Sequence, residues 1–212
     1  AQADLARVCV RVNPPATPAG RADLAMLASA PRVAAVVVPK AGARADLSRV
    51  SALVGDLPLI ALIETAQGVA RCESIAEAPH VVALAFGPYD LAAELGGESS
   101  ADAMLPHRAR MLVAARAAGR WAIDGPSREY GDPAIPARDA EHARRLGYDG
   151  KLLIHPAQLA PVRAAFAPSP AEIAYAERIV AAATSSPAVL DGTMIDTPIL
   201  SAAQRVLRRA RG

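Results

Sequence analysis

Polar residues able to bind metal ions or anions follow the short apolar runs of this sequence in a regular pattern. At least one stands at or soon after the end of each of six runs: Arg11 and Asn13, Lys40, Glu64, Asp90, Asp124 and His155. Where parallel strands alternate with helices, the carboxyl ends of the strands share one rim, and active sites are built there. The pattern therefore predicts an enzyme.

Glu64 and Asp90 follow successive apolar runs, so their carboxylates can converge at that rim. Mg²⁺ is commonly held by one or two carboxylates, with water and substrate oxygens completing its shell. The sequence has no Cys-x-x-Cys pair, and its four histidines lack the spacing of zinc ligands. Both acids could instead serve helix N-termini, Glu64 as a cap and Asp90 in a first turn. On residue types alone, both interpretations stay open.

The elements that must position these residues are short apolar runs alternating with amphipathic segments. Several runs are apolar on both faces, which is typical of parallel strands covered on each side. Alternating strands and helices predict a parallel sheet with right-handed crossovers. We predict strands at 7–12, 33–38, 59–63, 81–86, 121–123 and 151–154, and helices at 22–30, 45–54, 67–78, 101–118 and 139–146.

Six strands are fewer than the eight of a closed (β/α)8 barrel. The sheet is therefore either open and doubly wound, or a barrel whose first two βα units are lacking from this sequence. After residue 154 only helices are predicted, at 158–165, 170–183 and 197–211, with the best linker candidate at 185–187. We expect residues 1–166 to form the barrel portion and 167–212 a C-terminal helical segment.

Composition excludes several classes of protein. The net charge is only +2 and the arginines are interleaved with acids, so nucleic-acid binding is not expected. No apolar run approaches the roughly 18 residues of a membrane span, and no signal peptide opens the sequence. We predict a cytoplasmic protein without membrane contact. Cys9 and Cys72 are too few for a disulfide framework, and both are expected to be reduced and buried.

Short motifs in a fixed order resemble the citrate lyase beta-subunit-like family, which includes malyl-CoA, citramalyl-CoA and citryl lyases. The resemblance covers nearly the whole chain. It implies a TIM barrel of the phosphoenolpyruvate/pyruvate superfamily, here without its first two βα units, and a C-terminal helical extension. The motifs are RVNP (11–14), VPK (38–40), LIETA (62–66), AFGPYDL (85–91), AIDGP (122–126), GYDGK (147–151), IHPAQ (154–158) and GTMID (192–196).

The family's binding residues are carried over by these motifs. Glu64 and Asp90 match its magnesium ligands, for which Mn²⁺ is an alternative ion. Arg11 matches the arginine that binds the carboxylate and oxo group of a 2-oxo acid, and a planar guanidinium suits that task. Asp124 is ambiguous: as an acid at the rim it could orient water or ligands without binding the metal itself.

Other matches keep two interpretations. Ile154 and His155 correspond to residues near bound coenzyme A or substrate, although His155 could be purely structural. Asp196 matches a catalytic acid that reaches a neighbouring subunit's site, but it also precedes a helix that it could cap. Lys40 could bind anionic substrate or pair with a carboxylate. Gly87 would let the backbone approach the oxo acid closely.

The resemblance implies a magnesium-dependent carbon–carbon lyase that cleaves or forms a 3-hydroxyacyl-CoA, giving an acyl-CoA and a 2-oxo acid. Coenzyme A would enter as part of the substrate, and a homotrimer is expected. The alternatives are a pyruvate-type class II aldolase acting on free 2-oxo acids, an acyl-CoA thioesterase of the same family, and a non-catalytic truncated subunit.

Overall fold

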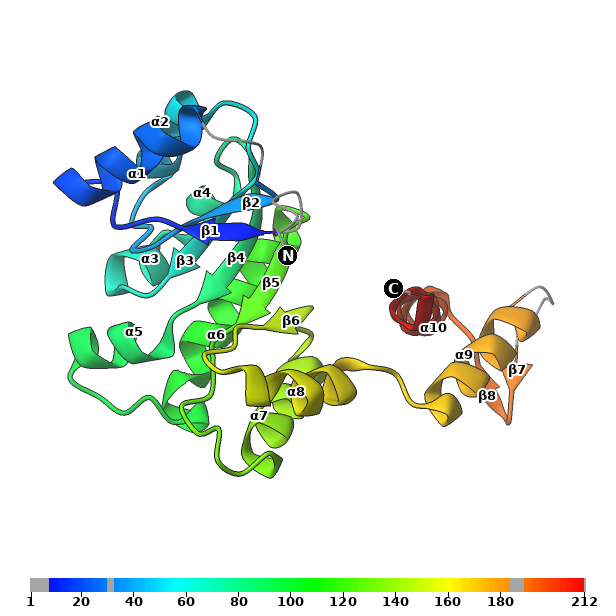
Figure 1. The fold of residues 1–212 in the computed structure, drawn as a ribbon. Helices are drawn as coiled ribbons and strands as arrows, with labels where there is room; N and C mark the ends of the chain where they lie inside the picture. Colours follow the sequence, from blue (N-terminus) through cyan, green and yellow to red (C-terminus); the bar gives the residue numbers. More distant parts are fainter. Residues whose placement is uncertain (1–7, 30–32, 184–188, 212) are drawn as a thin grey trace, which may run out of the picture. The chain divides into compact units, whose positions relative to one another are not determined.

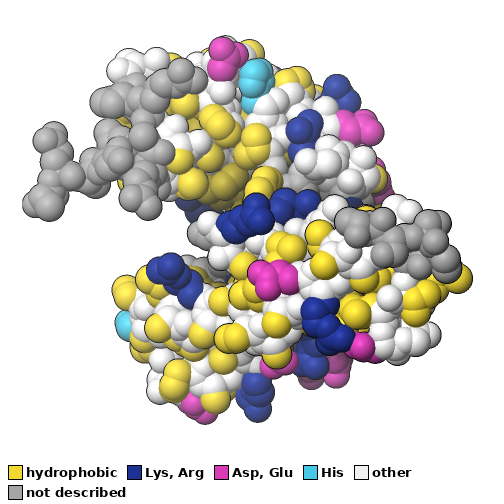
Figure 2. Space-filling model, turned by 90° about the vertical axis from the view of Figure 1, so that its right-hand side faces the viewer, with side chains coloured by type: hydrophobic (Ala, Val, Ile, Leu, Met, Phe, Trp, Pro, Cys, Tyr) yellow, Lys and Arg dark blue, Asp and Glu magenta, His cyan; other side chains and the backbone are white. Residues whose placement is uncertain are grey.

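The computed structural model describes residues 8–29, 33–183 and 189–211. The chain divides into two compact units, Ala1–Val162 and Arg163–Gly212. No helix among the described residues is long and apolar enough to cross a membrane. Basic and acidic side chains are interspersed with apolar ones on the face drawn in Figure 2.

The first unit is built on a six-stranded parallel sheet (Figure 1). Its strands are β1 (Cys9–Arg11), β2 (Ala35–Val38), β3 (Leu59–Ile63), β4 (Val81–Phe86), β5 (Trp121–Asp124) and β6 (Gly150–Lys151), hydrogen-bonded in that order. A doubly wound sheet reverses its strand order part-way, whereas a barrel adds strands in sequence order. The barrel-type interpretation is therefore confirmed, and the doubly wound one is wrong.

The central strands β3 and β4 are apolar on both faces because both faces are covered. Leu59, Ile63 and Leu84 are fully buried, as expected for parallel strands under helices. The register pairs Ile63 with Phe86, so the residues that follow these two strands, Glu64 and Gly87, come out side by side.

Helices connect the strands and extend past the sheet. They are α1 (Pro18–Ser29), α2 (Arg44–Val54), α3 (Ala66–Ala70), α4 (Cys72–Ala76), α5 (Pro88–Leu95), α6 (Ala101–Ala117), α7 (Ala134–Leu146), the 3-10 turn η2 (Pro156–Gln158) and α8 (Leu159–Phe166). The predicted helix 67–78 is two short helices, because Arg71 leaves the helical conformation (φ −121°, ψ 15°).

Other sequence predictions need correction. Helix α5 is not among the predicted helices and was considered only as an alternative for Asp90, and β6 covers two residues instead of the four expected at 151–154. Cys72 is buried as predicted, but Cys9 is exposed because β1 is the first strand of the sheet order and has one uncovered face. Residues 7, 30 and 185–187 of the predicted elements lie outside the described residues.

The second unit contains α9 (Pro170–Ala182) and α10 (Thr197–Arg211), with a short hairpin of β7 (Val189–Leu190) and β8 (Thr193–Met194) between them. Its small core holds Ala176, Ile179 and Ala203. Helix α10 is amphipathic and carries Arg208, Arg209 and Arg211 in its last turn, where cations complement the helix dipole. The hairpin was not predicted from the sequence.

Candidate active site

Glu64 is the most enclosed acid at the carboxyl end of the sheet. Its side chain is only 2% exposed. The backbone N–H of Lys40 donates to Oε1 at 3.0 Å, and Arg11 Nη2 lies 3.8 Å from the same oxygen. Burial raises the pKa of Glu64, with the Lys40 N–H acting in the opposite direction. A cation beside this carboxylate would relieve the cost of burying its charge.

Asp90 lies in the first turn of α5, soon after β4 ends. Its carboxylate accepts a hydrogen bond from Lys40 Nζ, and this contact raises the pKa of Lys40. Lys40 therefore meets both acids, Glu64 through its backbone and Asp90 through its side chain. Its backbone is left-handed (φ 52°), an uncommon conformation for a residue with a side chain. The left-handed turn after β2 thus places the backbone N–H of Lys40 against Glu64 and its side chain against Asp90.

Gly87 allows the segment carrying Asp90 to pass against Glu64. A Cβ atom at position 87 would lie 2.4 Å from Glu64 Cβ and 2.9 Å from Glu64 Oε2. Only glycine fits at this approach, so Gly87 keeps the space beside the buried carboxylate free of a side chain. The approach of Gly87 to a bound oxo acid stays a prediction; the close approach in the structure is to Glu64.

Two neighbours of the acids have other tasks. Thr65, not Glu64, caps helix α3, because its side chain accepts the N–H of Gly68 at 3.0 Å. The capping interpretation of Glu64 is therefore wrong, whereas Asp90 does sit in a helix first turn. Asn13 binds Asp23 through its backbone and side-chain nitrogens.

The side chain of Arg11 is 61% exposed, which leaves its guanidinium open to a ligand.

The donor set fits a magnesium ion. Among the described residues no group of three or more His, Cys, Asp and Glu side chains could hold a metal. Mg²⁺ needs no such cage, since it usually takes one or two carboxylates and keeps water or substrate oxygens for the rest. Glu64 and Asp90 supply two carboxylates at neighbouring strand ends. They lie next to Gly87, whose lack of a side chain leaves room beside Glu64.

Asp124, at the end of β5, belongs to a buried ion cluster. Arg108 Nε and Nη2 each donate to one of its oxygens at 2.9 Å, and Lys151 Nζ donates to Oδ2 at 3.0 Å. The three side chains are only 4–6% exposed. Arg108 and Lys151 were not predicted as functional residues. Arg108 lies four residues after Met104 and three before Met111 on the buried face of α6, so an arginine there required an anionic partner.

Comparison with known proteins identifies the family. The family profile described as HpcH/HpaI aldolase/citrate lyase matches residues 1–156. The chain belongs to this family. The citrate lyase beta-like assignment made from the motifs is therefore confirmed.

Relatives in the HpcH/HpaI family include enzymes and complexes of known structure. A (3S)-malyl-CoA thioesterase of Cereibacter sphaeroides is 41% identical over 209 residues, covering 95% of this chain and 73% of the relative. The crystal structure of CitE from Mycobacterium tuberculosis with magnesium, acetoacetate and coenzyme A matches with a TM-score of 0.87 and 34% identity. That match covers 100% of this chain and 80% of CitE.

The IHP motif of the family forms a turn in this chain. His155 caps η2, with its Nδ1 accepting the N–H of Ala157 at 3.1 Å. Its ring stacks on Tyr130 with centroids 4.3 Å apart. Buried Gln158 holds the turn by donating to the carbonyls of Ser127 and Glu129. Ile154 is exposed beside it. His155 thus has a structural role, and its ring and Ile154 remain accessible to a ligand.

Asp196 lies in the second unit, and the structure gives it a capping contact. Its Oδ1 accepts the N–H of Ile199 at 3.0 Å, in the first turn of α10. The side chain is exposed. The capping role predicted for Asp196 is thus present, and its catalytic role stays a prediction.

Proposed function

We propose that this chain is a magnesium-dependent carbon–carbon lyase that cleaves or forms a 3-hydroxyacyl-CoA. The observation that carries the proposal is the convergence of Arg11, Lys40, Glu64 and Asp90 at the carboxyl ends of β1 to β4. Two carboxylates beside an exposed guanidinium suit a 2-oxo acid, which offers a carboxylate and an oxo group to a metal and an arginine.

Glu64 and Asp90 would hold the ion. The magnesium in the CitE complex with acetoacetate and coenzyme A supports this assignment. When bound, Mg²⁺ supplies Lewis-acid stabilisation of negative charge on the substrate oxygen as the carbon–carbon bond breaks. The protein contributes a buried carboxylate in Glu64, and a Gly87 position that leaves room beside it.

Arg11 and Lys40 would bind the anionic end of the substrate. The exposed guanidinium of Arg11 can meet the oxo-acid carboxylate in a bidentate manner and adds fixed positive charge near the breaking bond. Lys40 Nζ is held beside the site by its hydrogen bond to Asp90. From there it would bind the carboxylate of the oxo acid together with Arg11. Exposed Ile154 and His155 would contact the coenzyme A portion of the substrate.

Proton transfer is assigned to Asp196 of a neighbouring subunit. In the cleavage direction the 3-hydroxyl loses its proton and becomes the oxo group as the bond between its carbon and the adjacent methylene carbon breaks. The methylene carbon gains a proton to give the acyl-CoA, so the reaction neither consumes nor releases a proton overall. Asp196 would supply the proton to that carbon. We further propose a homotrimer, in which residues 1–166 carry the metal site and 167–212 pack on a neighbour.

Product analysis tests this function. The protein is incubated with malyl-CoA, citramalyl-CoA or citryl-CoA, with Mg²⁺ or with EDTA, and both the 2-oxo acid and free thiol are measured. A lyase releases the 2-oxo acid without free thiol, and only when Mg²⁺ is present. Cleavage that continues in EDTA contradicts the metal-dependent proposal.

A thioesterase is the second candidate, because the 41% identical relative carries that name. It would release free thiol without any 2-oxo acid. Cleavage of free hydroxy-oxo acids alone would instead indicate a class II aldolase. If no substrate is turned over and calorimetry detects no Mg²⁺ binding, the chain is a non-catalytic subunit.

A further inference from the structure

Arg108, Asp124 and Lys151 form a buried ion cluster at the end of β5, the strand that pairs with β4, and Asp90 follows β4. We propose that Lys151 is a positioning residue that fixes Asp90 for metal binding through two packed loops. This inference rests on the proposed magnesium site and adds to it Lys151, the last residue of the GYDGK motif, to which the resemblance gave no role.

The β5 loop, residues 124–126 at the end of β5, is held in place by Lys151. Lys151 Nζ donates both to Asp124 Oδ2 and to the backbone carbonyl of Gly125. The Asp124 carboxylate is held on its other side by the bidentate contact from Arg108. Charge-assisted bonds among buried groups are strong because water does not compete for them. Residues 124–125 are thus held from α6 and β6 at once.

The β5 loop contacts the β4 loop, residues 86–89, which joins β4 to α5. A Cβ on Gly125 would lie 2.3 Å from Pro88 Cδ and 2.9 Å from the carbonyl oxygen of Phe86, so the Gly125 backbone packs directly against the Pro88 ring and the Phe86 carbonyl. Tyr89 Oη donates to the carbonyl of Pro126 at 2.9 Å.

The position of Asp90 depends on the β4 loop. The residues of the β4 loop that contact the β5 loop, Phe86 to Tyr89, lead directly into Asp90. A cavity of about 90 Å³ is lined by both loops and by the ion cluster. The β4 loop therefore has space into which it can shift when the β5 loop is released. Such a shift would move the Asp90 carboxylate relative to Glu64, which is anchored on β3.

Lys151→Met is the decisive variant. It removes the ammonium but leaves Asp124 neutralised by Arg108, so no buried carboxylate is left without a cation. Residues that hold a metal ligand in place typically change metal affinity by 10-fold to 100-fold. We expect the magnesium dissociation constant of Lys151→Met to rise about 10-fold in calorimetry. In the metal-free variant, hydrogen exchange of the backbone amides within residues 87–91, all but Pro88, should be faster.

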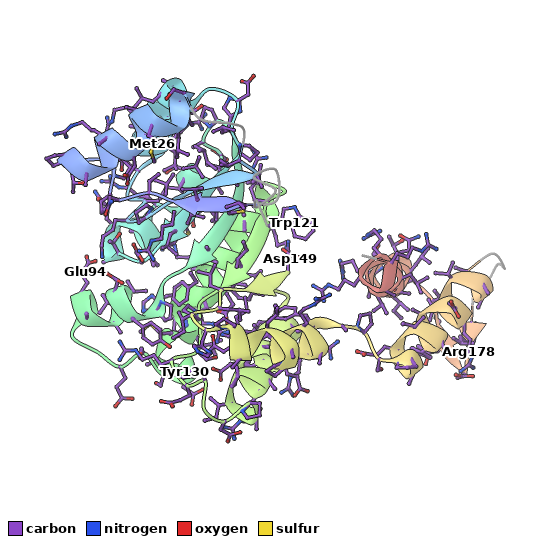
Figure 3. The ribbon with its side chains drawn as sticks, in the orientation of Figure 1. Met26, Glu94, Trp121, Tyr130, Asp149 and Arg178 are labelled. Carbon is purple, nitrogen blue, oxygen red and sulfur yellow. The ribbon has the colours of Figure 1, made fainter. Side chains whose placement is uncertain are left out.

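Arg116→Met is the matched control. Arg116 Nη2 also donates to a carboxylate and a backbone carbonyl, those of Asp149 and Gly147. Asp149 lies at the opposite end of the sheet from Glu94 of α5 (Figure 3). Arg116→Met should lower the melting temperature while leaving the magnesium dissociation constant and the exchange of residues 87–91 unchanged.

Tyr89→Phe removes the hydroxyl that donates to the carbonyl of Pro126, at the contact between the β4 and β5 loops. It should raise the magnesium dissociation constant and speed the exchange of residues 87–91, as Lys151→Met does.

The outcomes are distinct. Unchanged magnesium affinity in Lys151→Met, or equal losses in Lys151→Met and Arg116→Met, overturns the positioning role. If Lys151→Met does not fold, unaltered affinity in Tyr89→Phe overturns it instead. If the unmodified protein binds no magnesium, the proposed function fails, and the exchange of residues 87–91 still decides whether Lys151 fixes this loop.

Discussion

At the residue scale, the site depends on a carboxylate that is costly to bury. Glu64 is kept from water by the strands around it and meets the Lys40 N–H and the more distant Arg11 guanidinium. A buried acid with a raised pKa and cationic neighbours at a strand end is a typical functional arrangement. Gly87 is also required, because only a residue without a side chain lets the segment that carries Asp90 pack against Glu64.

Replacing either acid should remove magnesium-dependent activity. We expect Glu64→Gln and Asp90→Asn to abolish detectable turnover, because each removes one of the two carboxylates that would hold the ion beside the substrate. Steady-state kinetics with calorimetry of Mg²⁺ binding checks this, and circular dichroism controls for folding. Unchanged turnover in either folded variant contradicts the metal assignment.

Gly87→Ala should weaken magnesium binding without removing either ligand. The added methyl group would lie 2.4 Å from Glu64 Cβ, so the β4 loop or the Glu64 side chain must shift. Overpacking of this kind typically costs about 1–3 kcal/mol. Calorimetry and urea denaturation measure the two effects. Gly97→Ala is the control, since a Cβ there meets nothing within 4 Å; equal losses in both variants would count against the argument.

At the element scale, short helices fix the loops of the rim. Helix α3 has only five residues and begins two residues after Glu64. Because so short a helix has few internal hydrogen bonds, the Thr65 cap contributes much of its stability. Helix α5 holds Asp90 in its first turn, and its Glu94 accepts the N–H of Ala66 at 3.2 Å. The two helices that follow β3 and β4 are therefore linked to each other close to the acids.

Thr65→Ala should reduce the free energy of unfolding by about 1 kcal/mol, the usual cost of losing an N-cap. Magnesium affinity should fall as well, because Thr65 adjoins Glu64 in the chain. Ser169→Ala removes an equivalent cap from α9 in the second unit and should cost similar stability without changing magnesium affinity. Urea denaturation and calorimetry test both variants. If Ser169→Ala weakens magnesium binding equally, a local effect of Thr65 is ruled out.

At the scale of the whole molecule, the catalytic acid and the metal ligands are assigned to different units of the chain. Glu64 and Asp90 belong to the unit Ala1–Val162, and Asp196 belongs to Arg163–Gly212. The proposed function places Asp196 in a neighbour's site. Such an arrangement makes activity a property of the oligomer, with each site completed by two chains.

Mixing two inactive variants tests this arrangement. Glu64→Gln and Asp196→Asn are each expected to be inactive alone. After dissociation and random reassembly in equal amounts, about a quarter of the sites would combine an intact Glu64 with an intact Asp196 from another chain. Recovery of activity near that fraction supports the shared site. If Asp196→Asn alone retains full turnover, the catalytic role is wrong, and Asp196 is a helix cap.

The sequence by itself determined a parallel sheet alternating with helices and the residues brought to its rim, whereas the strand order of the structure decided between a barrel-type and a doubly wound sheet. Apolar runs that are buried on both faces fix where strands form, and alternation with helices makes the sheet parallel, so Glu64 and Asp90 had to follow neighbouring strands. Helix ends were less predictable, as α3, α4 and α5 show, because single residues such as Arg71 decide where a short helix stops.

Only the tertiary structure decided which side chains meet. That Lys40 contacts both acids, that Thr65 is the cap, and that Arg108 and Lys151 share Asp124 all depend on register and on contacts between distant segments. The physical reason is that periodicity reports which face of an element is buried, whereas a buried charge takes its partner from whichever segment packs against it.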